Sequence, residues 1–233
     1  MDWTTIITMD KQLLLWFNGS DSLFLDGMAK TLTTASTWIP LYLSLLYLVV
    51  KNNNSIQKIL LILAAAGLCV FLAGSLNDLL IKPWVCRWRP SRDPEIAMLV
   101  DTVNGYRGGD YGFFSSHAAN TFSIALFFSL LIRSKALTVG LVLWSLTNCW
   151  TRMYLGVHYP GDILCGLLWG ATVGIGMWYL HQYLRHRIDD SEQFVSTQYT
   201  STGYMLSDVS VVLSILVLTV LYAILRSCLY IYA

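Results

Sequence analysis

Three separate segments of the chain carry residue types that suit phosphate chemistry. The first contributes Lys82 and Arg89, the second Ser115, Ser116 and His117, and the third Arg152, His158 and Asp162. Arginine forks match the oxygens of a phosphate group, and a lysine adds a compact positive charge. The N-terminus of a helix, where a serine pair often stands, also attracts anions. If these segments meet, they predict a phosphate cradle.

The two histidines and the aspartate suit nucleophilic attack and proton transfer. His158 and Asp162 are four residues apart at a predicted helix start, so they share one helix face. A carboxylate on one imidazole nitrogen leaves the other free to attack a substrate or to bind a metal. His117 is available to protonate a leaving oxygen. The sequence has no acidic cluster of the kind that holds magnesium, so we expect neither a metal nor another cofactor.

Each of these residues also has a plainer explanation. Lys82 or Arg89 alone is typical of an interfacial anchor beside a membrane span. A serine pair or Asp162 can simply cap a helix, and a single histidine at a helix end usually caps or packs. Only their joint occurrence at one place favours a site, so the elements that position them decide the question.

Composition favours a membrane protein. Of 233 residues, 55% are hydrophobic and 12% are charged, whereas a soluble domain has about 25% charged residues. The formal net charge is +1, so the chain lacks the basic field that nucleic-acid binding needs. No segment indicates an obligatory protein partner, and we expect membrane lipids and a lipid phosphate to be the binding partners.

Six segments are apolar and long enough to approach a membrane span. They cover residues 33–50, 59–81, 115–132, 137–157, 160–180 and 209–229. Because successive spans alternate in direction, the three phosphate-binding segments are expected at the same membrane face. We therefore predict an all-α, six-transmembrane-helix bundle, a single domain over residues 1–233, with its catalytic motifs within residues 75–170.

The remaining segments suggest an orientation. Residues 9–19 form a short amphipathic pattern, which predicts either an interfacial helix or a helix packed on the bundle. Basic residues follow the first, third and fifth spans, which places those loops in the cytoplasm. The basic loop 82–112 runs against this rule, and we attribute its charges to chemistry and place it outside the cytoplasm. The polar stretch 185–207 is expected to be a solvated connector of undetermined role.

The motif spacing resembles that of the type 2 phosphatidic acid phosphatase (PAP2) superfamily. The resemblance rests on three patterns, Lys-x6-Arg-Pro, a Pro-Ser-Gly-His-like segment and Arg-x5-His-x3-Asp, matched here by Lys82, Arg89, Pro90, Ser115, His117, Arg152, His158 and Asp162. It implies that His158 is a nucleophile that forms a phosphohistidine, that Asp162 orients it, and that His117 protonates the leaving lipid oxygen. The phosphate ligands would be Lys82, Arg89, Ser115 and Arg152, with the Ser116 backbone N–H.

The sequence departs from that family pattern at three positions. Phe114 replaces a frequent proline, Ser116 a glycine, and Thr151 a serine. Ser116 keeps its backbone N–H but adds a side chain, so it either tightens the pocket or adds a hydroxyl contact. Asp78 lies four residues before Lys82, a spacing that lets a helical turn bring them together, although water exposure at the interface explains Asp78 equally well.

These observations predict a metal-independent lipid phosphatase in a bacterial inner membrane, with its active site facing the periplasm or exterior. By resemblance to bacterial envelope members of the family, the favoured substrates are undecaprenyl pyrophosphate and a lipid A phosphate. Phosphatidylglycerol phosphate and phosphatidic acid are the alternatives. A different class, a non-catalytic phospholipid-binding transporter, would keep the cations without needing His158 beside Asp162.

Overall fold

The chain folds as a helical bundle in its computed structural model. The described residues, 2–187 and 196–230, contain helices and loops and no β-strand, which confirms the all-α class. Residues 188–195, part of the expected connector, lie outside the described residues. The longer helices are α1 (Trp3–Phe17), α2 (Leu23–Thr33), α3 (Ile39–Lys51), α4 (Ile56–Val70), α6 (Ser116–Ile132), α7 (Lys135–Tyr154), α8 (Pro160–Arg185) and α9 (Leu206–Tyr230).

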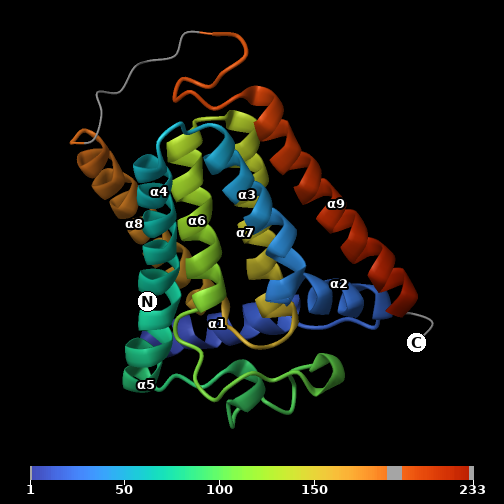
Figure 1. The fold of residues 1–233 in the computed structure, drawn as a ribbon. Coiled ribbons are helices and arrows are strands. Elements are labelled where there is room, and N and C mark those ends of the chain that lie inside the picture. The colour runs from blue at the N-terminus through green and yellow to red at the C-terminus, as the bar shows by residue number, and fades with distance from the viewer. Residues whose placement is uncertain (1, 188–195, 231–233) are drawn as a thin grey trace.

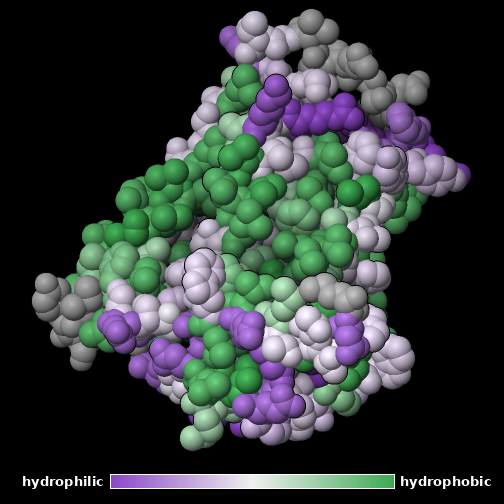
Figure 2. Space-filling model, turned by 180° about the vertical axis from the view of Figure 1, so that it is seen from behind, coloured by the Kyte–Doolittle hydropathy of each residue, from purple (hydrophilic) through white to green (hydrophobic). Residues whose placement is uncertain are grey.

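Short helical elements complete the chain. They are η1 (Ala35–Trp38), the π-helical turns η2 (Phe71–Ser75) and η3 (Asn77–Ile81), α5 (Lys82–Val85), η4 (Pro90–Arg92) and η5 (Val103–Gly105). Helix α6 packs against α4, α7 and α8, and α9 packs against α2 and α3, whereas α1 and α2 lie across one end of the bundle (Figure 1). On the face shown in Figure 2, hydrophobic residues gather over the middle and hydrophilic ones toward the two ends. This distribution fits an integral membrane protein.

The six expected spans are all helical, but not all are long and apolar enough to count as candidate spans. Three helices qualify, Ile56–Val85, Pro160–Arg185 and Leu206–Leu229, and a fourth qualifies if the bent pair α2–α3 is one span. Helix α6 is apolar but has only 17 residues. The membrane class therefore holds, while the six-span arrangement stays a prediction.

The first expected span begins later than predicted because the chain bends sharply before it. Helix α2 meets the helical segment Ala35–Lys51 at 70°. At the bend, the Thr37 hydroxyl donates to the Thr31 carbonyl at 2.7 Å, and the Trp38 indole donates to the Leu32 carbonyl at 2.8 Å. These bonds give partners to carbonyls at the end of α2, where the Thr31 carbonyl also accepts from Thr34 N at 3.3 Å. Pro40 then stands in the first turn of α3, where a missing N–H is tolerated.

The predicted N-terminal helix is present and longer than expected. It covers Trp3–Phe17 rather than residues 9–19, and only Leu14 is fully buried within it. Apolar side chains on its other faces are exposed, with Trp3 and Trp16 each 77% exposed. Such a helix suits a membrane interface, where tryptophan is favoured, and its placement there stays a prediction.

Glycines bring α6 and α8 into close backbone contact and so position the site. A methyl group added at Gly170 would stand 2.5 Å from the carbonyl oxygen of Ala119, and at Gly174 it would stand 2.6 Å from that of Ser123. Gly166 approaches the Ser115 carbonyl in the same way. Small residues at this spacing let membrane helices pack at short range. The N-terminal ends of α6 and α8 are thereby held side by side.

Replacing Gly170 with alanine is therefore expected to lower the thermal unfolding temperature of the detergent-solubilised protein. The added methyl group has no room against the α6 backbone, and such overpacking costs about 1–3 kcal/mol. Gly176→Ala is the matched control on the same helix, because nothing lies within 4 Å of its added methyl group. Equal unfolding temperatures for the two variants would contradict the close contact between α6 and α8.

Candidate active site

The three segments that carry the predicted site residues meet at one end of the bundle. The loop of residues 86–115 joins α5 to α6 and lies at the end where α7 stops and α8 begins (Figure 1). Ser91 N donates to the Gly156 carbonyl, and Ser115 N donates to the Asp162 carbonyl, both at 3.1 Å. These bonds tie the loop and the start of α6 to the connection between α7 and α8.

His158 lies in that connection and is 1% exposed. Its Nε2 is 3.1 Å from Nη1 of Arg89, which also donates to the Val157 carbonyl at 3.1 Å. Burial lowers the pKa of His158 well below its ordinary value, and the charges of Arg89, Arg152, Lys82 and His117 act in the same direction. A neutral imidazole keeps the lone pair that nucleophilic attack requires.

Asp162 lies beside His158 on the first turn of α8, but the two are not hydrogen bonded. His158 Nδ1 is 3.6 Å from Asp162 Oδ2, which is beyond a hydrogen bond. The fully buried carboxylate instead accepts from Arg87 Nη1 at 2.6 Å and from Tyr159 N at 3.0 Å. The spacing predicted that the pair would share a helix face, but His158 precedes the N-cap Tyr159 and only Asp162 is on α8. The two side chains still lie close together, and the direct orienting role of Asp162 stays a prediction.

Lys82 lies in the last turn of the long helical segment Ile56–Val85, and its ammonium group is paired. Its Nζ donates to Asp78 Oδ1 at 2.6 Å. The Lys82 side chain is 12% exposed, whereas that of Asp78 is 56% exposed. Both explanations of Asp78 therefore hold, because this carboxylate holds the lysine in place and also reaches solvent.

Arg89 and Arg152 are buried guanidinium groups without a carboxylate partner within the described residues. They are 8% and 3% exposed, and the Nε of each has no hydrogen-bond partner there. Arg152 Nη1 donates to the Thr33 hydroxyl and, at 3.1 Å, to the Tyr106 hydroxyl. Burial and then the charge of Arg152 lower the pKa of Arg89. Two buried cations that repel each other favour an anionic ligand between them.

The start of α6 contributes the serine pair and His117. The Ser115 hydroxyl accepts from Ala118 N at 3.4 Å, so it caps the helix as the plainer explanation expected. The Ser116 hydroxyl donates to Asp78 Oδ1 at 2.8 Å and accepts from Asn77 Nδ2 at 2.8 Å. The departure from glycine at residue 116 thus adds a hydroxyl contact that holds Asp78, the partner of Lys82.

Sequence reasoning missed two residues that shape the site. Arg87 binds the Asp162 carboxylate, and Gly112 brings the loop backbone against it. A methyl group at Gly112 would stand 3.2 Å from Arg89 Cγ and 3.3 Å from Asp162 Oδ2. The sequence did contain one indication of Arg87. It lies in a basic loop that is expected outside the cytoplasm, where few basic residues are usual. No comparable signal marked Gly112.

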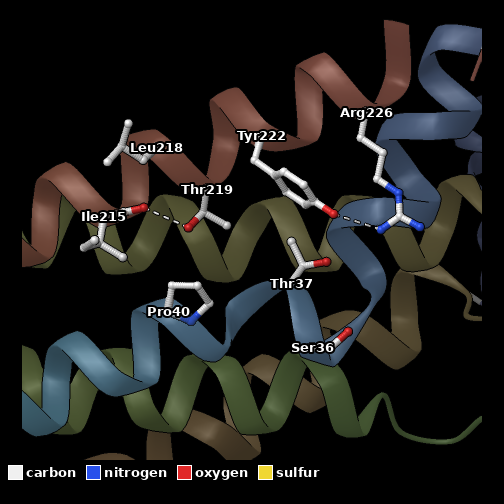
Figure 3. A pocket seen from close by; sticks show the side chains of 8 residues that line it. All are labelled: Ser36, Thr37, Pro40, Ile215, Leu218, Thr219, Tyr222 and Arg226. Atoms are coloured by element: carbon white, nitrogen blue, oxygen red, sulfur yellow. Dashed lines mark hydrogen bonds between the residues drawn. The ribbon is translucent and has the colours of Figure 1, made fainter. Parts of the chain in front are cut away.

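A cavity of about 350 Å³ lies apart from these groups, between the α2–α3 bend and α9. Ser36, Thr37 and Arg226 line one end of it, and Pro40 and Ile215 line the other (Figure 3). The Arg226 guanidinium donates to the Tyr222 hydroxyl at 3.2 Å. None of the predicted site residues lines this cavity.

Comparisons with known proteins agree with the geometry. A family model described as PAP2 superfamily matches residues 58–186. The chain is 42% identical over 182 residues to a lipid A 4'-phosphatase of Bacteroides thetaiotaomicron, covering 77% of this chain and 78% of the relative. It is 34% identical over 184 residues to a lipid A 4'-phosphatase of Porphyromonas gingivalis, covering 78% and 77% of the two chains.

A more distant relative is a decaprenylphosphoryl-5-phosphoribose phosphatase of Mycobacterium tuberculosis. The identity is 39% over 109 residues, which covers 47% of this chain and 55% of the relative. No solved structure matches the chain.

Proposed function

Because this chain belongs to the PAP2 superfamily, we propose that it is a lipid phosphatase that removes a phosphate from lipid A through a phosphohistidine intermediate. The observation that carries the proposal is the pair of buried, carboxylate-free guanidinium groups beside a neutral, buried His158. The similarity to two lipid A 4'-phosphatases over three quarters of the chain supports this substrate. We place the site at the extracytoplasmic face of a bacterial inner membrane.

In the proposed first step, His158 Nε2 attacks phosphorus and the bond from phosphorus to the lipid oxygen breaks. His117 donates a proton to that leaving oxygen. Arg89, Arg152 and Lys82 neutralise charge on the phosphoryl oxygens, with Ser115 and the Ser116 backbone N–H as further ligands. Arg89 Nη1 lies 3.1 Å from the attacking nitrogen, so this guanidinium is close enough to bind an oxygen of the phosphoryl group that Nε2 attacks.

In the second step, water attacks the phosphohistidine. His117 takes a proton from that water, the phosphorus–nitrogen bond breaks, and inorganic phosphate leaves with His158 restored as a neutral imidazole. Asp162 carries the charge that favours a proton on Nδ1, so the lone pair of Nε2 is available to attack phosphorus in the first step. Its distance of 3.6 Å from Nδ1 requires a small movement for a hydrogen bond to form.

The proposal is tested by phosphate release from a panel of purified lipids in detergent. The panel holds lipid A, undecaprenyl pyrophosphate, phosphatidylglycerol phosphate and phosphatidic acid. We expect the highest kcat/KM on lipid A, with product analysis showing loss of one phosphate. A higher value on the polyprenyl lipid would favour the second candidate, to which the similarity to the decaprenylphosphoryl-5-phosphoribose phosphatase points. Release from none of the four lipids would refute the proposal.

We also predict that activity persists in excess chelator. The reaction described above uses protein cations alone to neutralise phosphate charge, and the described residues hold no group of three or more metal-binding side chains. The measurement is the phosphate release rate before and after dialysis against a chelator, with an unrelated magnesium-dependent phosphatase as the positive control. Loss of activity that added metal restores would contradict the metal-independent reaction.

A further inference from the structure

Arg87 is held between two carboxylates from distant parts of the chain. Its Nη1 donates to Asp162 Oδ1 and its Nη2 to Asp10 Oδ2, each at 2.6 Å. The Asp10 side chain is 13% exposed and that of Arg87 is 26% exposed. Ion pairs this short and this shielded are stronger than surface pairs. The guanidinium therefore links α1 to the residue beside His158.

Asp10 makes a second contact to the same place. Its Oδ1 accepts from Gly161 N at 2.8 Å, in the first turn of α8 and next to Asp162. The neighbouring Lys11 contacts the loop instead, pairing with Asp93 at 3.0 Å and with Glu95 at 2.6 Å. Helix α1 thus contacts this region through two neighbouring side chains, Asp10 and Lys11. Of these two, Asp10 contacts the Arg87–Asp162 pair.

The charge of Asp10 determines how much of the Asp162 charge is left for His158. A guanidinium whose only partner is Asp162 would neutralise that carboxylate and weaken its pull on the proton at His158 Nδ1. Asp10 shares Arg87 and offsets its charge, so Asp162 keeps a net negative charge toward the imidazole. Asp162 is fully buried, where such interactions are weakly screened.

We propose that Asp10, acting through Arg87 and Asp162, is a positioning residue of the phosphoryl-transfer site, so the N-terminal helix belongs to the catalytic machinery. The inference rests on the proposed function. Asp10 touches no reacting atom. Its effect should fall on kcat, because the phosphate ligands that set substrate binding are on other elements.

The test is the variant Asp10→Asn in the full-length, detergent-solubilised protein. Asparagine still accepts from Gly161 N but cannot ion-pair with Arg87. We expect kcat on the best lipid substrate to fall about 10- to 100-fold, by analogy with residues that orient metal ligands from the outer shell, with KM within about twofold of wild type. Asp10→Glu restores the charge and should recover part of the loss.

Two control variants distinguish a positioning role of Asp10 from a role in merely holding α1 against the bundle. Asp2→Asn makes the same change at an exposed position beside α1 and should leave kcat unchanged. Lys11→Gln removes the ion pairs of α1 with Asp93 and Glu95 and leaves the ion pairs of Arg87 in place. An unchanged kcat in Asp10→Asn, or an equal loss in Lys11→Gln, would overturn the inference. Both of these outcomes are measured against an active wild-type protein. Failure of the proposed function is a different result, because wild type itself would then release no phosphate.

Discussion

Replacing His158 with alanine is expected to reduce phosphate release by about 10⁴-fold or more, the loss typical when a nucleophile is removed. His158 Nε2 is the imidazole nitrogen that lies 3.1 Å from Arg89 Nη1. The measurement is kcat/KM on the best lipid substrate of the panel. The variant removes a buried ring, so its thermal unfolding must be recorded beside its activity.

His186→Ala is the matched control for this loss. His186 follows α8 at the end opposite to His158 and is exposed, so its removal should leave turnover unchanged. A lipid-binding measurement on His158→Ala completes the test, because the cations remain and should still hold the lipid phosphate. Turnover that survives in a folded His158→Ala would contradict the phosphohistidine reaction.

Lipid binding and phosphate release, measured together, distinguish a phosphatase from a transporter. A protein that only binds lipid headgroups would keep Lys82, Arg89 and Arg152 and would gain nothing from a buried, neutral His158. If wild type bound the lipids of the panel but released phosphate from none of them, the transporter would be the better explanation. Similarity to two phosphatases over three quarters of the chain favours the enzyme.

The meeting of the three motif segments could be predicted because it depends only on the direction of successive helices. Lys82 lies in the last turn of one long helical segment, His117 in the first turn of α6, and Arg152 in the last turn of α7. Any bundle of alternating helices brings such ends to one face. Side-chain types and their spacing were therefore sufficient to predict that these segments lie at the same end of the bundle, whereas the roles of their residues stay predictions.

The contacts that refine the site could not be predicted, because they join residues far apart in the sequence. Arg87 and Asp10 are separated by 77 positions, and Arg152 and Thr33 by 119. Local patterns carry no information about such pairs. The bend before α3 escaped prediction for a related reason, since the bonds from Thr37 and Trp38 to the α2 carbonyls compete with a continuous helix.

Replacing Arg152 with methionine should separate catalysis from stability. We expect kcat/KM on the lipid to fall by about 10³-fold or more, because an arginine that neutralises phosphoryl charge contributes that much in related chemistry. Arg152→Lys keeps the charge but loses the planar fork, and should retain part of the activity. The measurements are kcat/KM and the thermal unfolding temperature of each variant.

The thermal unfolding temperature of Arg152→Met is expected to rise or to stay equal to that of wild type. Arg152 is 3% exposed, its Nε has no partner among the described residues, and its charge acts against Arg89. Removing a buried charge that no carboxylate pairs should not destabilise the fold, and an apolar residue of similar length fills the space. An arginine that only anchored α2 through Thr33 would give the reverse result. Arg152→Met would then unfold at a lower temperature, and Thr33→Val would reproduce its loss of activity.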